Sequence, residues 1–123
     1  MSRTVAGANE GTRDESKSEL SDLYESLKAF LVAMGDGVQV NTLKYYVAFK
    51  RLKNFACVEV YPKVKKLIVY VKVDPTTVEL REGFTRDVRN VGHYGTGDLQ
   101  ITISTVSDFE EAKSFLIQSY EAS

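Results

Sequence analysis

Apolar residues recur at steps of three and four from residue 20 onward, the period of one face of an amphipathic helix. The positions on this stripe are Leu20, Leu23, Tyr24, Leu27, Phe30, Leu31 and Met34. Ser16 and Glu19 have the spacing of a capping box, which predicts the start of the helix. Gly35 predicts its end, because glycine readily adopts the left-handed conformation that closes a helix.

The middle of the chain changes to a period of two and is rich in β-branched and aromatic residues, which indicates strands. We predict strands over residues 38–41, 44–51, 55–61 and 66–73. The connections between them are short, so we expect neighbouring strands to pair as an antiparallel meander.

The last third returns to mixed patterning. Asp74 followed by Pro75 predicts a short helix or turn that runs to about Leu80. Residues 81–98 look irregular, and alternation over residues 99–104 predicts another strand. A capping box at Ser107 and Glu110 then begins a final amphipathic helix, whose apolar positions are Phe109, Ala112, Leu116 and Tyr120.

This order of elements predicts an α+β fold. We expect an antiparallel sheet of about five strands, with the N-terminal and C-terminal helices packed on one face. Residues 1–15 are small, polar and charged, which predicts a disordered tail. Residues 16–123 are expected to form a single domain, since a chain of 123 residues has room for one hydrophobic core.

Composition says more about where the protein is located than about any reaction. Cys57 is the single cysteine, so the chain has no internal disulfide and no cysteine-based zinc site. No apolar run approaches the roughly 18 residues that a membrane span needs, and the N-terminus lacks the apolar region of a secretory signal. We therefore expect a cytoplasmic protein with no membrane partner, no metal and no cofactor.

Charge is unevenly distributed along the chain. Residues 42–73 carry eight bases and only one acid, Glu59, for a net charge of +7, whereas the remainder carries −8. The bases are Lys44, Lys50, Arg51, Lys53, Lys63, Lys65, Lys66 and Lys72. Tyr46 and Tyr70 share predicted strand faces with some of them, and cations interleaved with aromatics suit phosphate neutralisation and base stacking. Lysines that protect sheet edges from aggregation are the structural alternative.

A second candidate site is the glycine-rich segment before the last predicted strand. It contains Gly92, His93, Tyr94, Gly95, Gly97 and Asp98. The glycines have the order G-x-x-G-x-G and precede a strand, whereas a dinucleotide fingerprint has the order G-x-G-x-x-G and precedes a helix. A tight connection in which the glycines supply positive φ is the simpler interpretation, and anion contact by its backbone is the alternative.

The sequence resembles the DUF5655 family, a domain of unknown function. The resemblance runs from about Leu20 to Glu121, and its most specific parts are residues 46–55 and the segment GHYGTGD at 92–98. Members also occur as the C-terminal part of larger proteins, some of them nuclease-like or defence-related. The resemblance thus implies an accessory role, with nucleic acid as one target. It assigns no catalytic residues, and no apolar segment supports the "predicted transport protein" label that some members carry.

The sequence offers only weak evidence for a catalytic site. A Cys57–His93 dyad requires a thiol and an imidazole within hydrogen-bond reach and an activated thiol, whereas a cysteine inside an apolar strand is usually structural. Restriction-type nucleases place a Glu-x-Lys on a strand to hold Mg²⁺. A Glu-x-Lys occurs at residues 15–17, near the start of the first helix rather than on a strand, and the spacing from Glu59 to Lys63 does not fit.

We therefore expect a non-enzymatic accessory domain that contacts nucleic acid through its basic meander, without sequence preference. One alternative is a protein–protein interaction module that uses a sheet edge. A third hypothesis is a small-ligand or enzymatic site around His93, Tyr94 and Asp98. The third hypothesis depends on the orientation of His93 and Tyr94, which either point inward and hold the turn or point outward, where they can meet a ligand.

Overall fold

The computed structural model of the chain describes residues 15–123. The predicted tail over residues 1–15 lies outside this part, apart from Glu15, where helix α1 begins. The predicted capping box at Ser16 also depends on a side chain outside the described residues.

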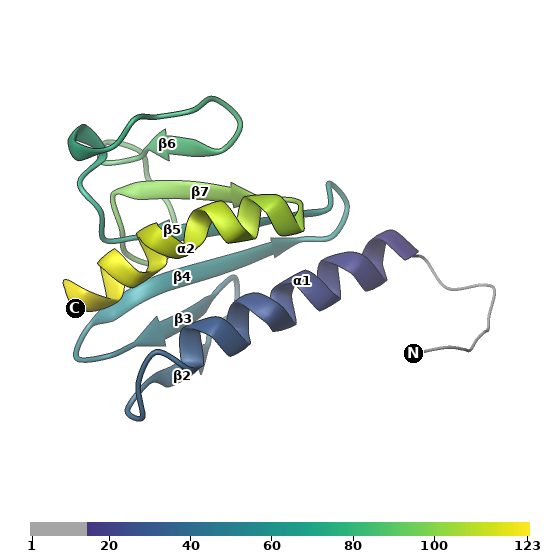
Figure 1. Cartoon of the computed structure of the whole chain (residues 1–123), viewed down its shortest axis with the longest axis horizontal. Helices are drawn as coiled ribbons and strands as arrows, with labels where there is room; N and C mark the ends of the chain where they lie inside the picture. The colour runs from purple at the N-terminus through teal and green to yellow at the C-terminus, as the bar shows by residue number, and fades with distance from the viewer. Residues whose placement is uncertain (1–14) are drawn as a thin grey trace.

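The fold is an antiparallel sheet with a helix from each end of the chain packed on it, as predicted (Figure 1). The sheet has six strands in the order β2-β3-β4-β5-β7-β6, and every neighbouring pair is antiparallel. The strands are β2 (Gln39–Thr42), β3 (Val47–Lys50), β4 (Asn54–Tyr61), β5 (Lys66–Val71), β6 (Thr85–Asp87) and β7 (Leu99–Ile103). The expected number, about five, was too low. The missed strand is β6, which has only three residues and gains its order by pairing with β7.

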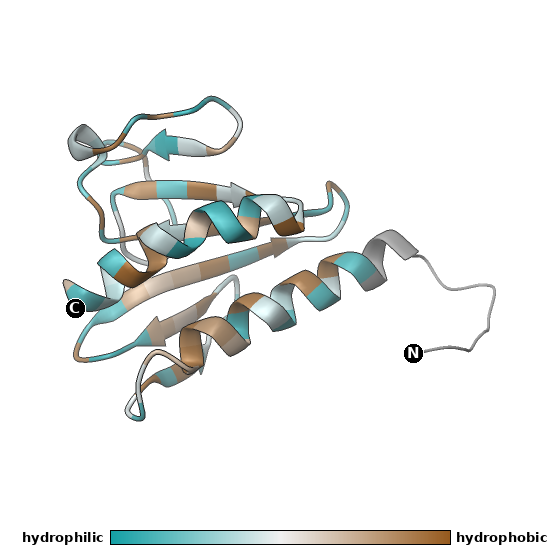
Figure 2. Ribbon diagram, viewed as in Figure 1, coloured by the Kyte–Doolittle hydropathy of each residue, from teal (hydrophilic) through white to brown (hydrophobic). Residues whose placement is uncertain are grey.

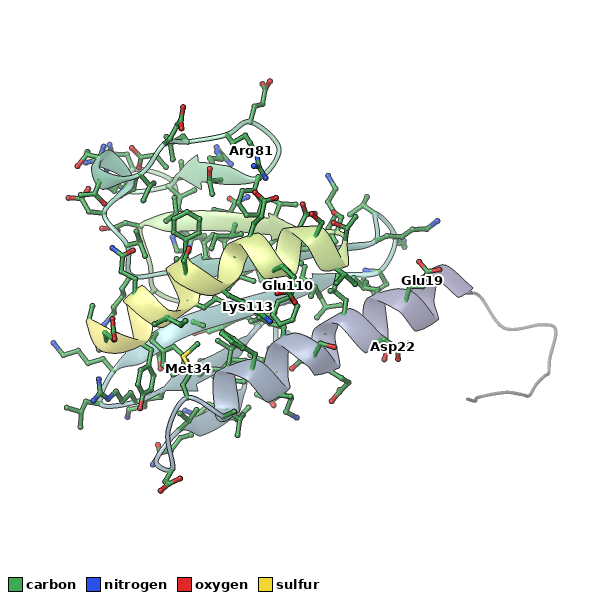
Figure 3. The ribbon with its side chains drawn as sticks, viewed as in Figure 1. Glu19, Asp22, Met34, Arg81, Glu110 and Lys113 are labelled. Carbon is green, nitrogen blue, oxygen red and sulfur yellow. The ribbon has the colours of Figure 1, made fainter. Side chains whose placement is uncertain are left out.

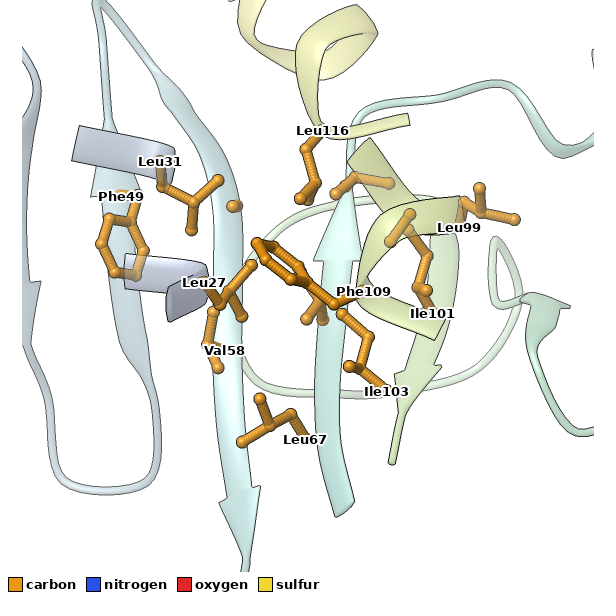
Figure 4. Close-up of a cluster of buried hydrophobic side chains, with 14 of the residues drawn as sticks. Leu27, Leu31, Phe49, Val58, Leu67, Leu99, Ile101, Ile103, Phe109 and Leu116 are labelled. Atoms are coloured by element: carbon orange, nitrogen blue, oxygen red, sulfur yellow. The ribbon is translucent and has the colours of Figure 1, made fainter. Parts of the chain in front are cut away.

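Helices α1 (Glu15–Val32) and α2 (Val106–Glu121) cover the same face of the sheet (Figure 1). Their apolar sides meet alternate strand residues in one core, whose centre is shown in Figure 4. Leu27 and Leu31 of α1 and Leu116 of α2 are fully buried there. The alternation is visible along β7, where apolar and polar colours follow one another (Figure 2), because Leu99, Ile101 and Ile103 face the helices.

A cationic contact lies where the two helices meet. Lys113 of α2 lies between the helices (Figure 3), with its ammonium 5.2 Å from the ring centroid of Phe30 and 4.9 Å from that of Phe109. Its Nζ also lies 3.0 Å from a carboxylate oxygen of Glu110. The lysine stem can therefore cover apolar surface while its charge keeps a partner.

A buried hydroxyl joins α2 to two strands. Ser119 is fully buried, accepts a hydrogen bond from the Lys72 amide (2.7 Å) and donates one to the Phe55 carbonyl oxygen (2.6 Å). Both backbone groups lie next to strand ends, where the sheet supplies no partner. The serine hydroxyl thus satisfies one donor and one acceptor that burial would otherwise leave costly.

The first helix ends differently from the prediction. Helix α1 ends at Val32, and Gly35 does not have positive φ. Its lack of a side chain matters for another reason: a Cβ at this position would collide with the hydroxyl of Tyr120. Gly35 leaves room for an aromatic ring from α2, which no local pattern in the sequence could indicate.

The predicted capping box of the last helix was two residues too late. The N-cap of α2 is Thr105, whose hydroxyl accepts from the Asp108 amide (3.0 Å), and the Asp108 carboxylate accepts from the Thr105 amide in return (3.2 Å). Strand β7 ends at Ile103, so the chain must turn into the helix before Ser107. The short helix after Asp74 is a 3-10 turn, η1 (Pro75–Thr77), whose N-cap is Asp74 as predicted.

The strand predicted over residues 44–51 is shorter in the structure. Strand β3 begins at Val47, because residues 43–46 form a turn closed by a hydrogen bond from the Leu43 amide to the Tyr46 carbonyl (2.9 Å). Tyr45 and Tyr46 therefore leave the ladder, and their rings stack on Tyr94. This contact belongs to the other face of the sheet.

Candidate functional site

The face of the sheet opposite the helices is crossed by residues 88–98, which we call the strap. Its ends are joined, because the Val88 amide donates to the Asp98 carbonyl (2.9 Å). Beneath it lies a second buried cluster, formed by Ala48, Cys57, Tyr70 and Val88. Residues 48, 57 and 70 alternate with strand residues that face the helices, so this cluster lies on the far side of the sheet from the main core.

Two strap glycines allow this close approach. Gly95 has φ +79°, and a Cβ there would lie 2.6 Å from the Cβ of Cys57. Gly97 has φ +136°, and a Cβ there would lie 2.7 Å from the backbone nitrogen of Val71. Both backbone conformations disfavour any side chain. Gly92 has neither constraint, so only two of the three glycines have the structural role that the sequence indicates.

His93 points inward. Its ring stacks on that of Tyr70, with centroids 4.0 Å apart and planes 3° from parallel. Its Nδ1 lies 3.0 Å from the Tyr94 carbonyl oxygen and its Nε2 lies 3.0 Å from that of Gly97. Carbonyl oxygens only accept hydrogen bonds, so at each of these contacts the ring nitrogen is the donor when it carries the proton. The imidazole therefore holds the strap closed.

Cys57 and His93 do not form a catalytic pair. The thiol sulfur accepts a hydrogen bond from the Thr96 amide (3.5 Å), and both imidazole nitrogens face carbonyl oxygens. Burial raises the pKa of the Cys57 thiol, against a smaller lowering by that amide. An activated nucleophile requires a lowered thiol pKa, so the thiol acts as a packing group.

Tyr94 points outward. Its ring stacks on Tyr45, with centroids 4.9 Å apart and planes 24° from parallel, and lies 6.2 Å from Tyr46. Both Tyr94 and Tyr45 remain about half exposed, at 52% and 55%. The Lys44 ammonium lies 5.2 Å from the centroid of the Tyr45 ring. The outer edge of the strap thus adds an accessible aromatic surface to the sheet.

Beside this surface lies Glu59, a buried acid that was not among the site residues predicted from the sequence. It is 5% exposed, and its Oε1 accepts from the hydroxyls of Tyr61 (2.8 Å) and Tyr70 (3.4 Å). The signal that could have indicated its role is its position: it is a lone acid inside a buried strand, flanked at alternate positions by Cys57 and Tyr61.

Both tyrosines titrate late because of these surroundings. Burial, followed by the nearby Glu59 carboxylate, raises the pKa of Tyr70 to about 12. The hydrogen bond to Glu59 raises the pKa of Tyr61, with a smaller contribution from Tyr94. Tyr94 stacks near Tyr46, which precedes the Val47 that pairs with Val58, so the strap and this part of β4 are neighbours. Glu59, Tyr61 and Tyr94 therefore belong to one locality.

The predicted basic residues divide between the two ends of the sheet. The register pairs Tyr61 with Lys66 at one end of β4, and Ala56 with Val71 near the other. Lys44, Lys63, Lys65 and Lys66 accordingly lie at the end where β4 leads into β5. Lys50, Arg51, Lys53 and Lys72 lie at the opposite end. The eight bases do not converge on one surface.

One member of the second basic group, Arg51, has a structural partner. Arg51 donates to the Tyr120 carbonyl oxygen at the end of α2 (3.2 Å), and its guanidinium lies 4.5 Å from the centroid of the Tyr120 ring. Lys72 lines a shallow depression with Asp98 and Arg89. Asp98 and Tyr94 thus face opposite ends of the sheet, and the glycine-rich segment does not form one site.

The first basic group lies beside the exposed tyrosines. We call this region the tyrosine end; its members are Lys44, Tyr45, Tyr61, Lys63, Lys65, Lys66 and Tyr94. Tyr61 is 44% exposed, and the four lysines are exposed as well. Among residues 15–123, no ion pair joins these lysines to an acid. Cations and accessible aromatic rings therefore occur together at one end of the sheet.

Within residues 15–123 there is no group of three His, Cys, Asp or Glu side chains arranged to hold a metal ion. In the same range, neither helix is long and apolar enough to cross a membrane.

Comparison with known proteins defines the family. A family model described as "Domain of unknown function (DUF5655)" matches residues 10–123. The chain belongs to the DUF5655 family. This DUF5655 chain is also similar to an uncharacterized protein of Haemophilus influenzae, with 28% identity over 99 residues. The match covers 80% of the chain but 32% of the relative, so the chain spans about a third of that protein's length. No solved structure matches this DUF5655 chain.

Proposed function

We propose that this domain is a non-enzymatic binding module that contacts single-stranded nucleic acid at its tyrosine end. The observation that carries the proposal is the coincidence of exposed Tyr45, Tyr61 and Tyr94 with four exposed lysines. Lysines neutralise phosphates, and every base offers a face that can stack on an aromatic ring. A cytoplasmic location, expected from the composition, is part of the same proposal.

The geometry favours single strands over duplexes. The exposed rings lie at the end of a sheet beside its strap. Tyr45 and Tyr94 cover one face of each other, so an unstacked base would stack on ring surface that this pair leaves exposed. Each base that stacks on an aromatic ring contributes about 1–3 kcal/mol to binding. A duplex hides its base faces, so it could use only the four lysines of this end.

Matched lysine variants test the proposal. The variant K44Q/K63Q/K66Q removes three charges from the tyrosine end, and K50Q/K53Q/K72Q removes three from the opposite end. Lys65 is left in place because it has a φ of +59°, where a new side chain could alter the turn. Binding to a labelled 20-base single strand is measured by fluorescence anisotropy at several salt concentrations.

We expect the first variant to lose at least about tenfold in affinity, and the slope of log K against log salt to fall by about 2, which is 0.7 for each lost phosphate contact. The second variant should change affinity less than about threefold, because its lysines lie away from the rings. The proposal fails if the unaltered protein binds no strand at low salt, or if the two variants lose affinity equally.

A second candidate, a protein–protein module, is favoured by strand β2. This edge strand is exposed at all four of its residues and leaves one side unpaired, which suits the addition of a partner strand. Such binding would depend on backbone hydrogen bonds and would respond little to salt. A partner that binds unchanged at 50 mM and 500 mM salt would support this candidate over nucleic acid.

A further inference from the structure

We infer that Glu59 reads the edge of a base held at the tyrosine end, so that the bound strand is preferentially one whose bases carry an amino group, cytosine above thymine. This inference rests on the proposed function. It adds a base preference to contacts that were expected to be independent of sequence.

The first step is that Glu59 has no structural counter-charge. No Lys or Arg among residues 19–123, whose side chains the structure describes, forms an ion pair with it, and its hydrogen bonds in that range both go to Oε1. A buried carboxylate without a cation is costly, and an apolar residue would pack at this position at lower cost. A buried acid that the fold does not need is a candidate for binding.

The second step concerns access. The stronger of the two hydrogen bonds to Glu59 comes from Tyr61, at 2.8 Å, whereas Tyr70 lies at 3.4 Å beneath the strap. Tyr61 is the last residue of β4 and is 44% exposed, so its ring can move without disturbing the core. A base can take the place of its hydroxyl and donate to Oε1 instead, with Oε2 still available.

The third step is the chemistry of the base edge. A carboxylate is an acceptor only, so it selects groups that donate. Cytosine presents its N4 amino group, a known partner of Glu and Asp side chains. At the position of that amino group thymine presents the O4 carbonyl, which repels a carboxylate, and its one ring donor, N3–H, lies at the next position along the edge. The two pyrimidines have similar size and stacking area, so a difference in their binding affinity reflects the hydrogen-bonding groups on the edge of the base.

The experiment compares labelled 15-base oligo-dC and oligo-dT by fluorescence anisotropy at pH 8. The variant E59Q replaces an acceptor with an amide that both donates and accepts. The variant E121Q removes the same charge from the exposed end of α2, away from the strap face. The ratio of the two affinities is the readout, because removal of an acid near the phosphates strengthens both.

We expect the unaltered protein and E121Q to bind oligo-dC about tenfold more tightly than oligo-dT, as one well-placed pair provides. E59Q should reduce that ratio to below about threefold. Equal binding of the two strands by the unaltered protein overturns the inference and leaves the proposed function intact, and so does a ratio that survives in E59Q. Binding of neither strand at low salt overturns the proposed function itself.

A second variant keeps the inference testable if E59Q does not fold. Y61F keeps the ring for stacking and removes the hydroxyl that competes for the Glu59 carboxylate. We expect Y61F to increase the preference for oligo-dC by at least about twofold, because the closer of the two hydroxyls that donate to Oε1 is then gone and only the longer contact from Tyr70 competes with the base. A preference that is unchanged or smaller in Y61F contradicts the inference.

Discussion

The face of the sheet under the two helices and the face under the strap differ in what they bury. The first buries aliphatic and aromatic side chains that come from both helices and from alternate strand residues. The second buries a thiol, a carboxylate and a tyrosine hydroxyl, each with a hydrogen-bond partner on that face. Apolar burial needs no particular partner, whereas buried polar groups need specific ones. The helix-covered face therefore accounts for most of the stability, and the strap face has the more specific geometry.

The largest expected effect is on the helix-covered face. Leu67 is fully buried there, so Leu67→Ala leaves a cavity and should lower the free energy of unfolding by about 3 kcal/mol. Urea unfolding followed by circular dichroism measures the change. Val60→Ala, at an exposed position of β4, is the control and should change little. A loss below 1 kcal/mol for Leu67→Ala would contradict the assignment of the main core to this face.

The strap should be sensitive at one glycine and tolerant at another. Gly97→Ala forces a Cβ against the backbone of Val71 at positive φ, which should cost about 2–3 kcal/mol of unfolding free energy. Gly92→Ala meets open space at ordinary φ and should change stability by less than 0.5 kcal/mol. Thermal unfolding of the two variants in parallel measures the difference. Equal effects would mean that the strap does not lie against β5.

The strap face should also show a dependence on alkaline pH. The pKa of Tyr70 is raised from its ordinary value of 10.0 to about 12, so the folded protein keeps its phenol proton to higher pH than the unfolded chain. The resulting stabilisation is fully present below pH 10 and is lost as the pH rises toward 12, on the order of 2 kcal/mol in all. Urea unfolding across this range should show a shallower loss for Tyr70→Phe than for the unaltered protein. Parallel pH profiles would refute the effect.

The smallest expected effect on stability is at the start of helix α2. Thr105→Ala removes the N-cap hydroxyl of α2 and should cost about 1 kcal/mol of unfolding free energy. Ser107→Ala, at the position where the sequence pattern placed the cap, should change stability by less than 0.5 kcal/mol. Chemical denaturation of both variants distinguishes them. A larger loss for Ser107→Ala would restore the cap position expected from the sequence.

The fold class could be predicted because its signals are local. The period of Leu20, Leu23 and Leu27 requires one buried helix face, and the period of Leu67, Val69 and Val71 requires one buried strand face. Strand β6 could not be predicted, since three residues carry too little pattern and only pairing with β7 orders them. The cap of α2 was misplaced because two serine or threonine boxes compete in sequence, and the end of β7 decides between them.

The candidate site was predictable in composition but not in arrangement. The basic residues and the glycine-rich segment stood out by type, and the register of β4 with β5 then separated those bases by the length of the strands. Glu59 could not be identified by residue type, because the unusual property of this acid is that it is buried, and burial is not visible in the sequence. The stack of Tyr94 on Tyr45 joins residues 49 positions apart, beyond the reach of any local pattern.

The sequence by itself determined the two helices, most strands, the antiparallel sheet and membership of the family, because periodicity and motif are properties of neighbouring residues. Only the tertiary structure decided that the strap covers the second face, that His93 turns inward and Tyr94 outward, and that four of the eight predicted bases lie beside exposed tyrosines. These arrangements depend on which distant backbone and side-chain groups satisfy one another when the chain is compact. That choice is made by packing and hydrogen bonding across the sheet, and no local pattern encodes it.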